Sequence, residues 1–252
     1  MPHSNNLILS RINRIDLEAL RRHFFIAELK FGEILAESRG VVNKVYFPHG
    51  GIISSIVELS VGSAIETGMI GKDGLFGAAQ ALDDKLSLNK VMVQVPGVAT
   101  VIEASRLKEV ANKSPDLRAL LIEYEQFFLA QVQQTTACNA LHSVEQRTCK
   151  WLIRMYDLVG GKELPLTQEF LAQMMGVQRT SVTGIAAQLQ KDGLISYRRG
   201  KVTILNIDLL HGFACECPQT VREHYVQMFG ITDAPETISG QSRSLEAMPA
   251  AK

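Results

Sequence analysis

Cysteine is absent from the first 137 residues of this 252-residue chain, and its four cysteines all lie in the second half. An iron–sulfur cluster in the N-terminal half, which would take about four thiolates, is therefore not expected. No Cys-x-x-Cys pair occurs, and the closest pair is Cys215 and Cys217 in "CEC". We interpret these cysteines as packed or free thiols and predict no metal, with a redox or metal role for the "CEC" pair as the alternative.

Long apolar runs are also missing. No stretch of about 18 apolar residues occurs, so no membrane span is expected. The N-terminus "MPHSNNLILSRINR" lacks the extended apolar region of a secretory signal, which favours a cytoplasmic protein. An apolar content of 46% with 21% charged residues is typical of a folded globular chain, and 252 residues allow two domains.

Net charge is lacking too, since 26 basic residues balance 26 acidic ones. The distribution is uneven, however. Residues 143–206 hold nine basic and five acidic residues, a net charge of +4, so the remainder carries −4. A modestly basic segment attached to an acidic one indicates local attraction to phosphate in the C-terminal half.

Short β-type runs occupy residues 31–105, after a helical segment around "DLEALRRHFF" (16–25). The runs are "EIL", "KVYF", "GIISSIVEL", "AIETGMI", "KVMVQV" and "VATVIEA". Turn-rich pieces separate them: "SRG", "PHGG", "VGS", "GKDG" and "PG". Several short strands at this spacing predict a small sandwich or barrel.

The next segment is helical over an unusual length. Ser114 is suited to cap the helix, Pro115 to its first position and Asp116 to its first turn. No glycine or proline follows up to residue 143, which allows roughly 40 Å of helix. A compact β domain cannot cover such a helix, so residues 114–142 are predicted to form a homodimer seam. Packing on its own β domain is the alternative.

A tight helix-turn-helix pattern follows. Ser143 and Gln146 predict a capping box for a helix that ends at Gly160–Gly161, and "ELPLT" predicts a short strand before the N-cap Thr167. Counting from Gln168, the fifth residue is Ala172, small enough for two helices to cross. The ninth is Gly176, which tolerates the turn. In the second helix, four apolar residues at helical spacing face inward: Val182, Ile185, Ala186 and Leu189.

The outward face of that second helix is smooth. Thr180, Gly184, Ala187 and Lys191 lie opposite Val182, and small side chains there would let the backbone descend into a major groove about 12 Å wide. Arg179 is suited to a bidentate contact with guanine; an ion pair with an acidic surface residue is its alternative role. The predicted DNA-binding residues of this motif are Thr167, Gln168, Gln178, Arg179, Thr180, Ser181, Thr183 and Gly184.

A hairpin follows in "LISYRRGKVTILN". Its two β-type arms flank "RRGK", which gathers Arg198, Arg199 and Lys201 beside a glycine turn. Beside a helix-turn-helix, we interpret this as a cationic wing that contacts DNA phosphates. An ordinary solvated turn is the alternative.

The order of parts resembles the Crp/Fnr family of bacterial transcription regulators, most specifically in "LPLTQEFLAQMMGVQRTSVTGIAAQLQKDGLISYRRGKVTILN". The resemblance implies an α+β chain with four parts: a β-roll sensor domain (1–112), a dimerisation helix (113–142), a winged helix-turn-helix domain (143–212) and a largely disordered C-terminal tail (213–252). It implies a homodimer that binds a two-fold-related operator in double-stranded DNA and recruits or blocks RNA polymerase.

The chain departs from the family pattern in both functional regions. Family members often carry Glu and a second Arg on the recognition helix, where this chain has Thr180 and Gly184. In the sensor, Ala78 stands where cyclic-nucleotide binders have a ribose-binding Glu, and Asn89 at the phosphate-binding Arg. A buried phosphate without a cationic partner is unfavourable, so we predict no tight cyclic AMP binding and no cofactor. Haem is not expected either, since lone histidines are more often structural.

Two other classes of function remain as alternatives. A metal-dependent enzyme on the β-roll would need several ligands converging in the barrel, but His49 is the only histidine between residues 31 and 105. No nucleophile motif or phosphate loop accompanies it, so the chain is predicted not to be an enzyme. The other alternative is a signal-binding or protein-interaction β-roll with weak, non-specific DNA binding.

Overall fold

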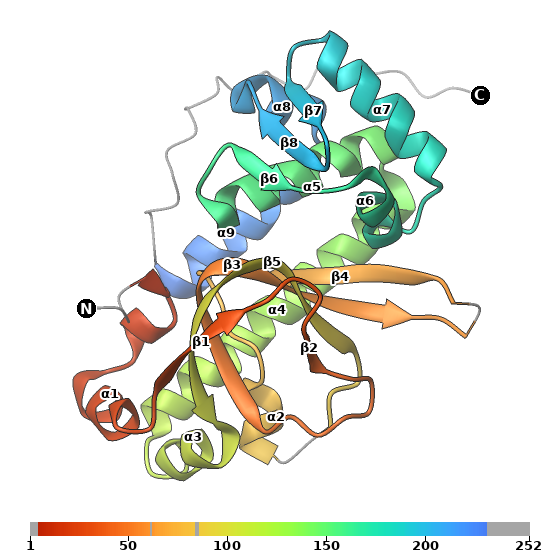
Figure 1. Ribbon diagram of the computed structural model, residues 1–252. Helices are drawn as coiled ribbons and strands as arrows, with labels where there is room; N and C mark the ends of the chain where they lie inside the picture. The colour runs from red at the N-terminus through yellow and green to blue at the C-terminus, as the bar shows by residue number, and fades with distance from the viewer. Residues whose placement is uncertain (1–4, 61, 84–85, 231–252) are drawn as a thin grey trace, which may run out of the picture.

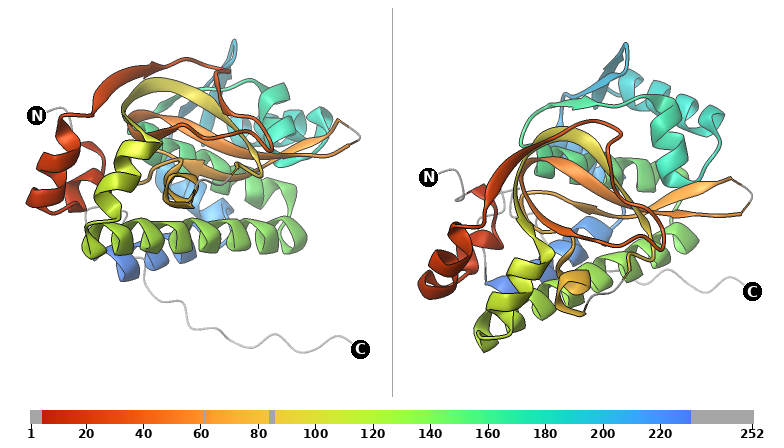
Figure 2. Two further views of the ribbon diagram at one scale, coloured as in Figure 1. Left: turned by 90° about the horizontal axis from the view of Figure 1, so that it is seen from below. Right: turned by 60° about the horizontal axis from the view of Figure 1, so that its bottom comes forward.

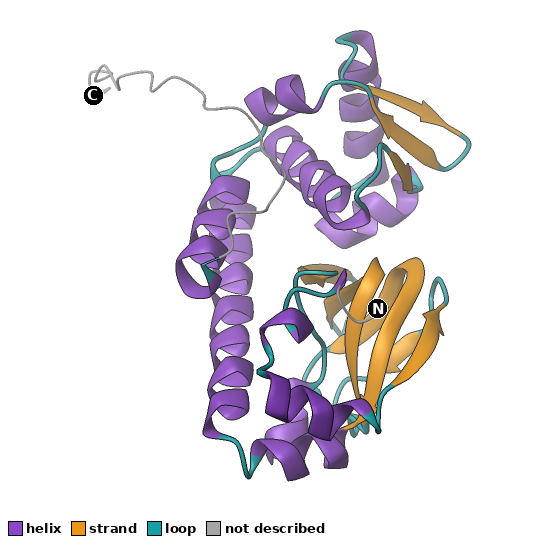
Figure 3. Cartoon of the chain, turned by 90° about the vertical axis from the view of Figure 1, so that its left-hand side faces the viewer, coloured by secondary structure: helices purple, strands orange, loops and turns teal. Residues whose placement is uncertain are grey.

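The computed structural model describes residues 5–60, 62–83 and 86–230. They form a sheet domain and a smaller winged domain, and one long helix leads from the first to the second (Figure 1). Figure 3 shows the long helix running along the side of the sheet domain toward the winged domain. Within the described ranges, no helix combines the length and apolarity that crossing a membrane requires.

The sheet domain is an antiparallel roll with strand order β1-β5-β3-β4, and β2 pairs with β5. Small helices flank it at both ends. In chain order its elements are η2 (Leu9–Arg11), α1 (Arg14–Arg21), β1 (Phe25–Leu29), β2 (Ile34–Ala36), β3 (Lys44–Glu58), β4 (Ala64–Ile70), α2 (Ala78–Asp83), β5 (Lys90–Glu103) and α3 (Ala104–Ala111).

Two of the predicted turns are wrong, because the strands run through them. "PHGG" lies inside β3 and "PG" inside β5, so four expected short strands are two long ones. The β3–β5 register shifts around Gly50, which marks a bulge. A side chain at Gly97 would collide with the carbonyl oxygen of Gly50, so these glycines serve close approach of two bent strands.

The helical segment predicted over residues 16–25 is also too long. Helix α1 ends at Arg21, and Phe25 begins β1, where it pairs with Val101 of β5. The aromatic pair Phe24–Phe25 fits a strand as well as a helix, and only the partner strand decides between them.

Helix α4 (Pro115–Leu141) begins where the sequence predicts. The Ser114 Oγ accepts a hydrogen bond from the backbone N–H of Leu117 at 3.1 Å, and Pro115 occupies the first turn. Leu117, Leu121 and Tyr124 are buried against the sheet domain and its flanking helices. One face of the helix therefore belongs to the core of its own chain.

A helix in the C-terminal region corrects the predicted tail. Residues 213–252 are expected to be largely disordered, but Cys217–Phe229 form α9, which lies beside α4 (Figure 2, left). The ring of Phe127 on α4 contacts those of Tyr225 and Phe229 at centroid distances of 5.0 and 5.9 Å. Residues 231–252 lie outside the described residues.

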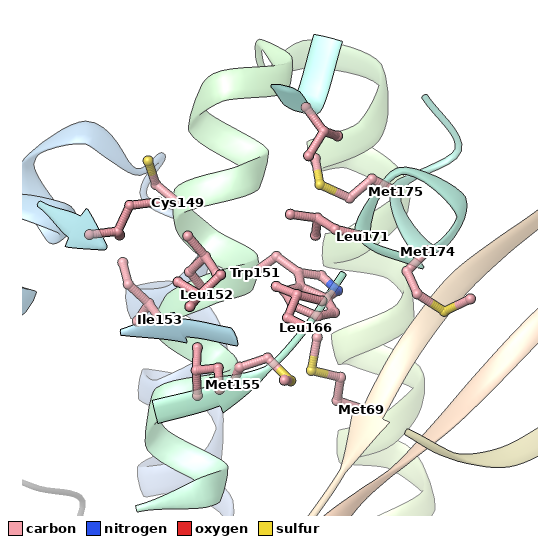
Figure 4. Close-up of a cluster of buried hydrophobic side chains, with 14 of the residues drawn as sticks. Met69, Cys149, Trp151, Leu152, Ile153, Met155, Leu166, Leu171, Met174 and Met175 are labelled. Carbon is pink, nitrogen blue, oxygen red and sulfur yellow. The ribbon is translucent and has the colours of Figure 1, made fainter. Parts of the chain in front are cut away.

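The winged domain is built on α5 (Val144–Val159), which starts at the predicted Ser143–Gln146 capping box. Its other elements are β6 (Glu163–Pro165), α6 (Gln168–Met175), α7 (Arg179–Lys191), β7 (Ile195–Arg198), β8 (Lys201–Ile204) and α8 (Ile207–Phe213). The three strands form an antiparallel sheet in the order β6-β8-β7. Figure 4 shows the apolar core of the winged domain around Trp151. This core includes Met69 of the sheet domain, so the two domains share buried surface.

Candidate nucleic-acid interface

The turn between α6 and α7 has the geometry that the sequence predicts. Gly176 ends α6 at φ +63°, in the left-handed region where glycine is favoured. Thr167 caps the start of α6 by accepting a hydrogen bond from the backbone N–H of Phe170 at 3.1 Å. Ala172 is buried at the crossing of the helices. The short helix α6 and the helix α7 thus pack against each other as a helix-turn-helix.

Helix α7 is held from beneath, as expected. Val182 and Leu189 are completely buried, Ala186 nearly so, and Ile185 partly buried. On the opposite face, the small residues Thr180, Gly184 and Ala187 are exposed together with Lys191. The smooth face is therefore a solvent-facing surface of the described chain.

Gly184 has no internal reason to be glycine. A Cβ at this position would meet nothing within 4 Å, and the residue has ordinary helical backbone geometry. Glycine in a helix interior lowers stability by about 1 kcal/mol relative to alanine. Packing within the described chain therefore does not require glycine at this position.

Arg179 forms an ion pair with an acidic surface residue, which is the alternative role that the sequence left open. Its Nη1 lies 3.6 Å from Oε2 of Glu169, and the two side chains are 67% and 79% exposed. Exposed ion pairs of this kind contribute about 0–1 kcal/mol, so Arg179 can exchange Glu169 for another partner at little cost. The sequence analysis did not identify Glu169 as the partner of Arg179, although an acidic residue in the first turn of α6 was a candidate.

Thr183 joins the two helices. Its hydroxyl donates to Gln168 Oε1 at 2.8 Å and is also 3.0 Å from the carbonyl oxygen of Arg179. The side-chain oxygen of Gln168 is thereby occupied, which orients its amide nitrogen away from Thr183. Gln178 and Ser181 are exposed beside them, at the start of α7.

The predicted wing is a two-residue hairpin between β7 and β8. Arg199 and Gly200 form its turn with φ of +47° and +78°, and Arg198 pairs with Lys201. All three basic side chains are exposed. Lys201 Nζ is 3.6 Å from Glu163 Oε2 in a second weak surface pair. Figure 3 shows the hairpin projecting from the winged domain.

The predicted residues converge on the first turn of α6. A Cβ at Gly200 in the wing would lie 3.5 Å from Thr167 Cγ2, the Thr183 hydroxyl bonds Gln168, and Arg179 pairs with Glu169. The wing, the start of α6 and the start of α7 therefore form one continuous surface with exposed cations and small polar groups.

The two positions at which the sheet domain departs from cyclic-nucleotide binders hold side chains that pack or bond within the chain. Ala78 is completely buried, and the Asn89 amide donates to Ser55 Oγ at 3.2 Å. The interior of the roll is filled by apolar side chains: Leu29, Ala36, Val42, Ile53, Ile70, Phe76, Val91, Val93, Ala99 and Val101.

A buried polar network instead lies where the sheet domain meets α5. Ser54 Oγ is 2.8 Å from Glu66 Oε2 and 2.5 Å from Gln94 Oε1. Trp151 of α5 donates its indole N–H to Glu66 Oε1 at 3.1 Å. Burial, partly offset by these hydrogen bonds, raises the pKa of Glu66 to about 7. The serine has one hydroxyl proton, so a protonated Glu66 that donates to Ser54 lets Ser54 donate to Gln94.

The network borders a cavity of about 670 Å³ between the sheet domain, α4, α5 and α9. Its lining includes Glu66, Arg147 and the ion pair of Arg154 with Asp73, whose Nη2–Oδ2 distance is 2.7 Å. The sequence did not predict this space, because the residues in its walls are spread along the chain from Leu7 to Val226.

Comparison with known proteins agrees with this geometry. Residues 146–213 match the Crp-like helix-turn-helix domain. The fold is similar to that of a CRP-family transcriptional regulator from Thermus thermophilus, with 17% identity, a TM-score of 0.64, and coverage of 75% of this chain and 96% of that one. FixK2 from Bradyrhizobium japonicum has 14% identity and a TM-score of 0.66, with coverage of 76% and 98%.

A third similar structure is CLP from Xanthomonas campestris, described as a c-di-GMP-responsive global regulator. It has 16% identity and a TM-score of 0.62, with coverage of 77% of this chain and 100% of that chain. No curated protein sequence matches the chain. The chain thus carries a Crp-like helix-turn-helix DNA-binding domain on the fold of Crp/Fnr transcription regulators, which confirms the resemblance predicted from the sequence.

Proposed function

We propose that the chain binds a two-fold-related operator in double-stranded DNA as a homodimer, and that cyclic AMP does not control this binding. The observation that carries the proposal is the exposed face around Gly184, where a glycine weakens a helix without serving the fold. Arg179 lies at the start of that face and the wing cations lie at its side. A major groove accepts an α-helix, and the surrounding cations meet its phosphates.

The outer face of α4 supports the dimer. A row of exposed residues along it recurs at steps of three and four, which is the spacing of a coiled-coil seam. None of the residues in this row is charged: Ala119, Ile122, Gln126, Leu129, Gln133, Thr136 and Ala140. Ile122 and Leu129 are 44% and 56% exposed, which is unusual for large apolar side chains in the middle of a long helix.

Charge complementarity favours a parallel second copy as the partner of this face. If the row provides the a and d positions of a heptad, starting with a at Ala119, then Arg118 is a g position. Glu123, five residues later, is an e position. In a parallel two-stranded coiled coil, these positions of opposite helices are neighbours. Arg118 of one copy would therefore meet Glu123 of the other, twice in a symmetric pair.

Independence from cyclic AMP rests on the sensor interior. The buried Ala78 offers no carboxylate to a ribose, and Asn89 offers no positive charge to a cyclic phosphate. Apolar side chains fill the roll beside them. A dimer placed on its operator would then regulate transcription by recruiting or blocking RNA polymerase, under a signal other than this nucleotide.

The decisive experiment selects bound duplexes from genomic DNA with the full-length chain. We expect selected sites to be two-fold related, with half-sites about 34 Å apart, and to bind roughly 10³-fold or more tightly than scrambled duplexes. Sedimentation should give two chains per duplex, and calorimetry should detect no micromolar binding of cyclic AMP. Equal affinity for selected and scrambled duplexes would refute specific binding, and a single chain per duplex would refute the dimer.

A further inference from the structure

Four side chains with metal-binding atoms converge where α4 ends and α9 begins. Cys138 and His142 are one helical turn apart at the end of α4, and Cys215 and Cys217 flank the start of α9. Their three Sγ atoms and a histidine nitrogen all lie within 4.8 Å of one another. The three cysteines are buried and form an apolar cluster of their own.

The distances within this cluster fit a tetrahedron around one ion. Tetrahedral Zn²⁺ with Zn–S near 2.3 Å and Zn–N near 2.0–2.1 Å places two sulfurs about 3.8 Å apart, and sulfur and nitrogen about 3.6 Å apart. Cys138 Sγ lies 3.6 Å from Cys215 Sγ, and Cys217 Sγ lies 3.6 Å from His142 Nδ1. Two edges of the tetrahedron are therefore present without movement of the backbone.

We propose that Cys138, His142, Cys215 and Cys217 form a closed Cys₃His site for one thiophilic divalent cation, of which Zn²⁺ is the type. Three thiolates with one imidazole are a soft donor set, which selects such ions over Mg²⁺ or Ca²⁺. Four protein ligands leave no open position, so the site is structural and not catalytic.

The surroundings of the four ligands fit this assignment. The other nitrogen of His142, Nε2, lies 3.2 Å from Oε2 of Glu216, an arrangement that orients a metal-bound imidazole. Gln134 Nε2 donates to Cys217 Sγ at 3.2 Å. A divalent ion with three thiolates and a neutral histidine has a net charge of −1, and Lys150 lies within electrostatic range of Cys138 to offset it.

The position of the site gives the ion a role. His142 is the last residue before the Ser143 cap of α5, and α5 carries the winged domain. An ion at this point would fasten the start of α9 to the junction between the long helix and the winged domain. Because the ion would bind only the folded arrangement, it would stabilise the chain by mass action.

The test is metal binding by the full-length, reduced, chelator-treated chain. We expect one Co²⁺ per chain, with thiolate-to-metal charge-transfer bands and the intense d–d bands of tetrahedral Co²⁺, and we expect Zn²⁺ to displace it. Zn²⁺ should also raise the temperature of thermal unfolding. Absence of these bands, octahedral Co²⁺ spectra, or iron with acid-labile sulfide in the purified chain would each overturn the single-ion site.

Two matched variants locate the ion. Cys217→Ser should abolish the charge-transfer bands, whereas Cys149→Ser should keep them, since Cys149 is equally buried but lies in the core of the winged domain. Glu216→Gln changes a 70% exposed side chain and should fold normally, with Zn²⁺ affinity lowered about tenfold. Retained bands in Cys217→Ser would refute the proposal. If that variant fails to fold, the Glu216→Gln titration decides, and unchanged affinity would refute the proposed arrangement.

Discussion

The candidate DNA-binding cations of the winged domain are exposed, whereas the sheet domain holds a buried polar network at its contact with α5. In the winged domain, Arg179 and Lys201 are on the outside, each held by one weak surface ion pair. In the sheet domain, Ser54, Glu66 and Gln94 are buried and bonded to one another. Surface pairs exchange readily for an external partner, whereas a buried network responds as a unit to any change in its protons or packing.

The difference indicates how the two domains are coupled. The indole N–H of Trp151, in the helix that begins the winged domain, reaches the buried carboxyl group of Glu66 in the sheet domain. The two domains thus share a hydrogen bond to a buried carboxyl group, and we expect a change of charge at Glu66 to alter it. The outer face of α4 resembles neither the exposed cations of the winged domain nor the buried network of the sheet domain. Its row of seam residues is both exposed and uncharged.

The largest effect is expected from Leu129→Asp on that outer face. Leu129 is 56% exposed, so the monomer should fold, but a carboxylate in a paired seam would face its own copy. Loss of the dimer removes simultaneous binding of two half-sites, which we expect to weaken operator binding about 10²-fold or more. Sedimentation and fluorescence anisotropy measure both effects.

Leu59→Asp is the matched control for the seam. Leu59 is 55% exposed, close to the value for Leu129, and directly follows β3 in the sheet domain. This variant should remain dimeric with unchanged affinity for DNA. A dimeric Leu129→Asp variant would show that the seam lies elsewhere.

The buried network is tested by the pH dependence of stability. Folding raises the pKa of Glu66 from 4.5 to about 7, so between these values the folded chain holds more protons at this group than the unfolded chain. The free energy of unfolding should therefore fall as the pH rises from about 4.5 through 7, by up to about 3 kcal/mol from this group. Urea unfolding at a series of pH values measures it.

Glu66→Gln should remove this slope and make the chain more stable at pH 8. The glutamine oxygen can still accept from Trp151, and its amide can donate to Ser54. Glu109→Gln, at a 57% exposed position on α3, should leave the profile unchanged. An unaltered slope in Glu66→Gln would mean that other groups produce the pH dependence.

Arg179→Ala tests the outward-facing side of the comparison. We expect a loss of about 1–3 kcal/mol in binding free energy and relaxed preference at one base pair. Glu169→Gln is the control, because it breaks the ion pair of Arg179 but keeps the guanidinium, and it should preserve or slightly raise affinity. If Arg179→Ala binds as the parent chain does, the β-roll is better explained as an interaction module with non-specific DNA binding.

The helix-turn-helix could be predicted because its signals are local. Thr167, Ala172, Gly176 and Val182 lie within sixteen residues and take the predicted cap, crossing, turn and inward positions. In the roll, Gly97 carries a signal shared by turns and bulges, and only the pairing of β3 with β5 decides between them.

Long-range features could be predicted only in part. Helix α9 has apolar residues at helical spacing and ends at Gly230, but its stability depends on Phe127 of α4. Cys138 and Cys215 lie 77 residues apart, and nothing in "CEC" shows which other ligands would join it. Such sites depend on tertiary packing, which cannot be predicted from the spacing of residues along the chain.

The smallest effect is expected from Arg198→Ala in the wing. A phosphate contact carries no base information, so selected and scrambled duplexes should both bind somewhat more weakly. The slope of log K against log salt should become shallower by about 0.9, the value for one released counterion. Affinities of both duplexes over a series of salt concentrations measure it, with Arg106→Ala, an exposed arginine on α3, as the control. An unchanged slope with lost specificity would mean that Arg198 reads a base, and the wing would then share the sequence readout that we assign to α7.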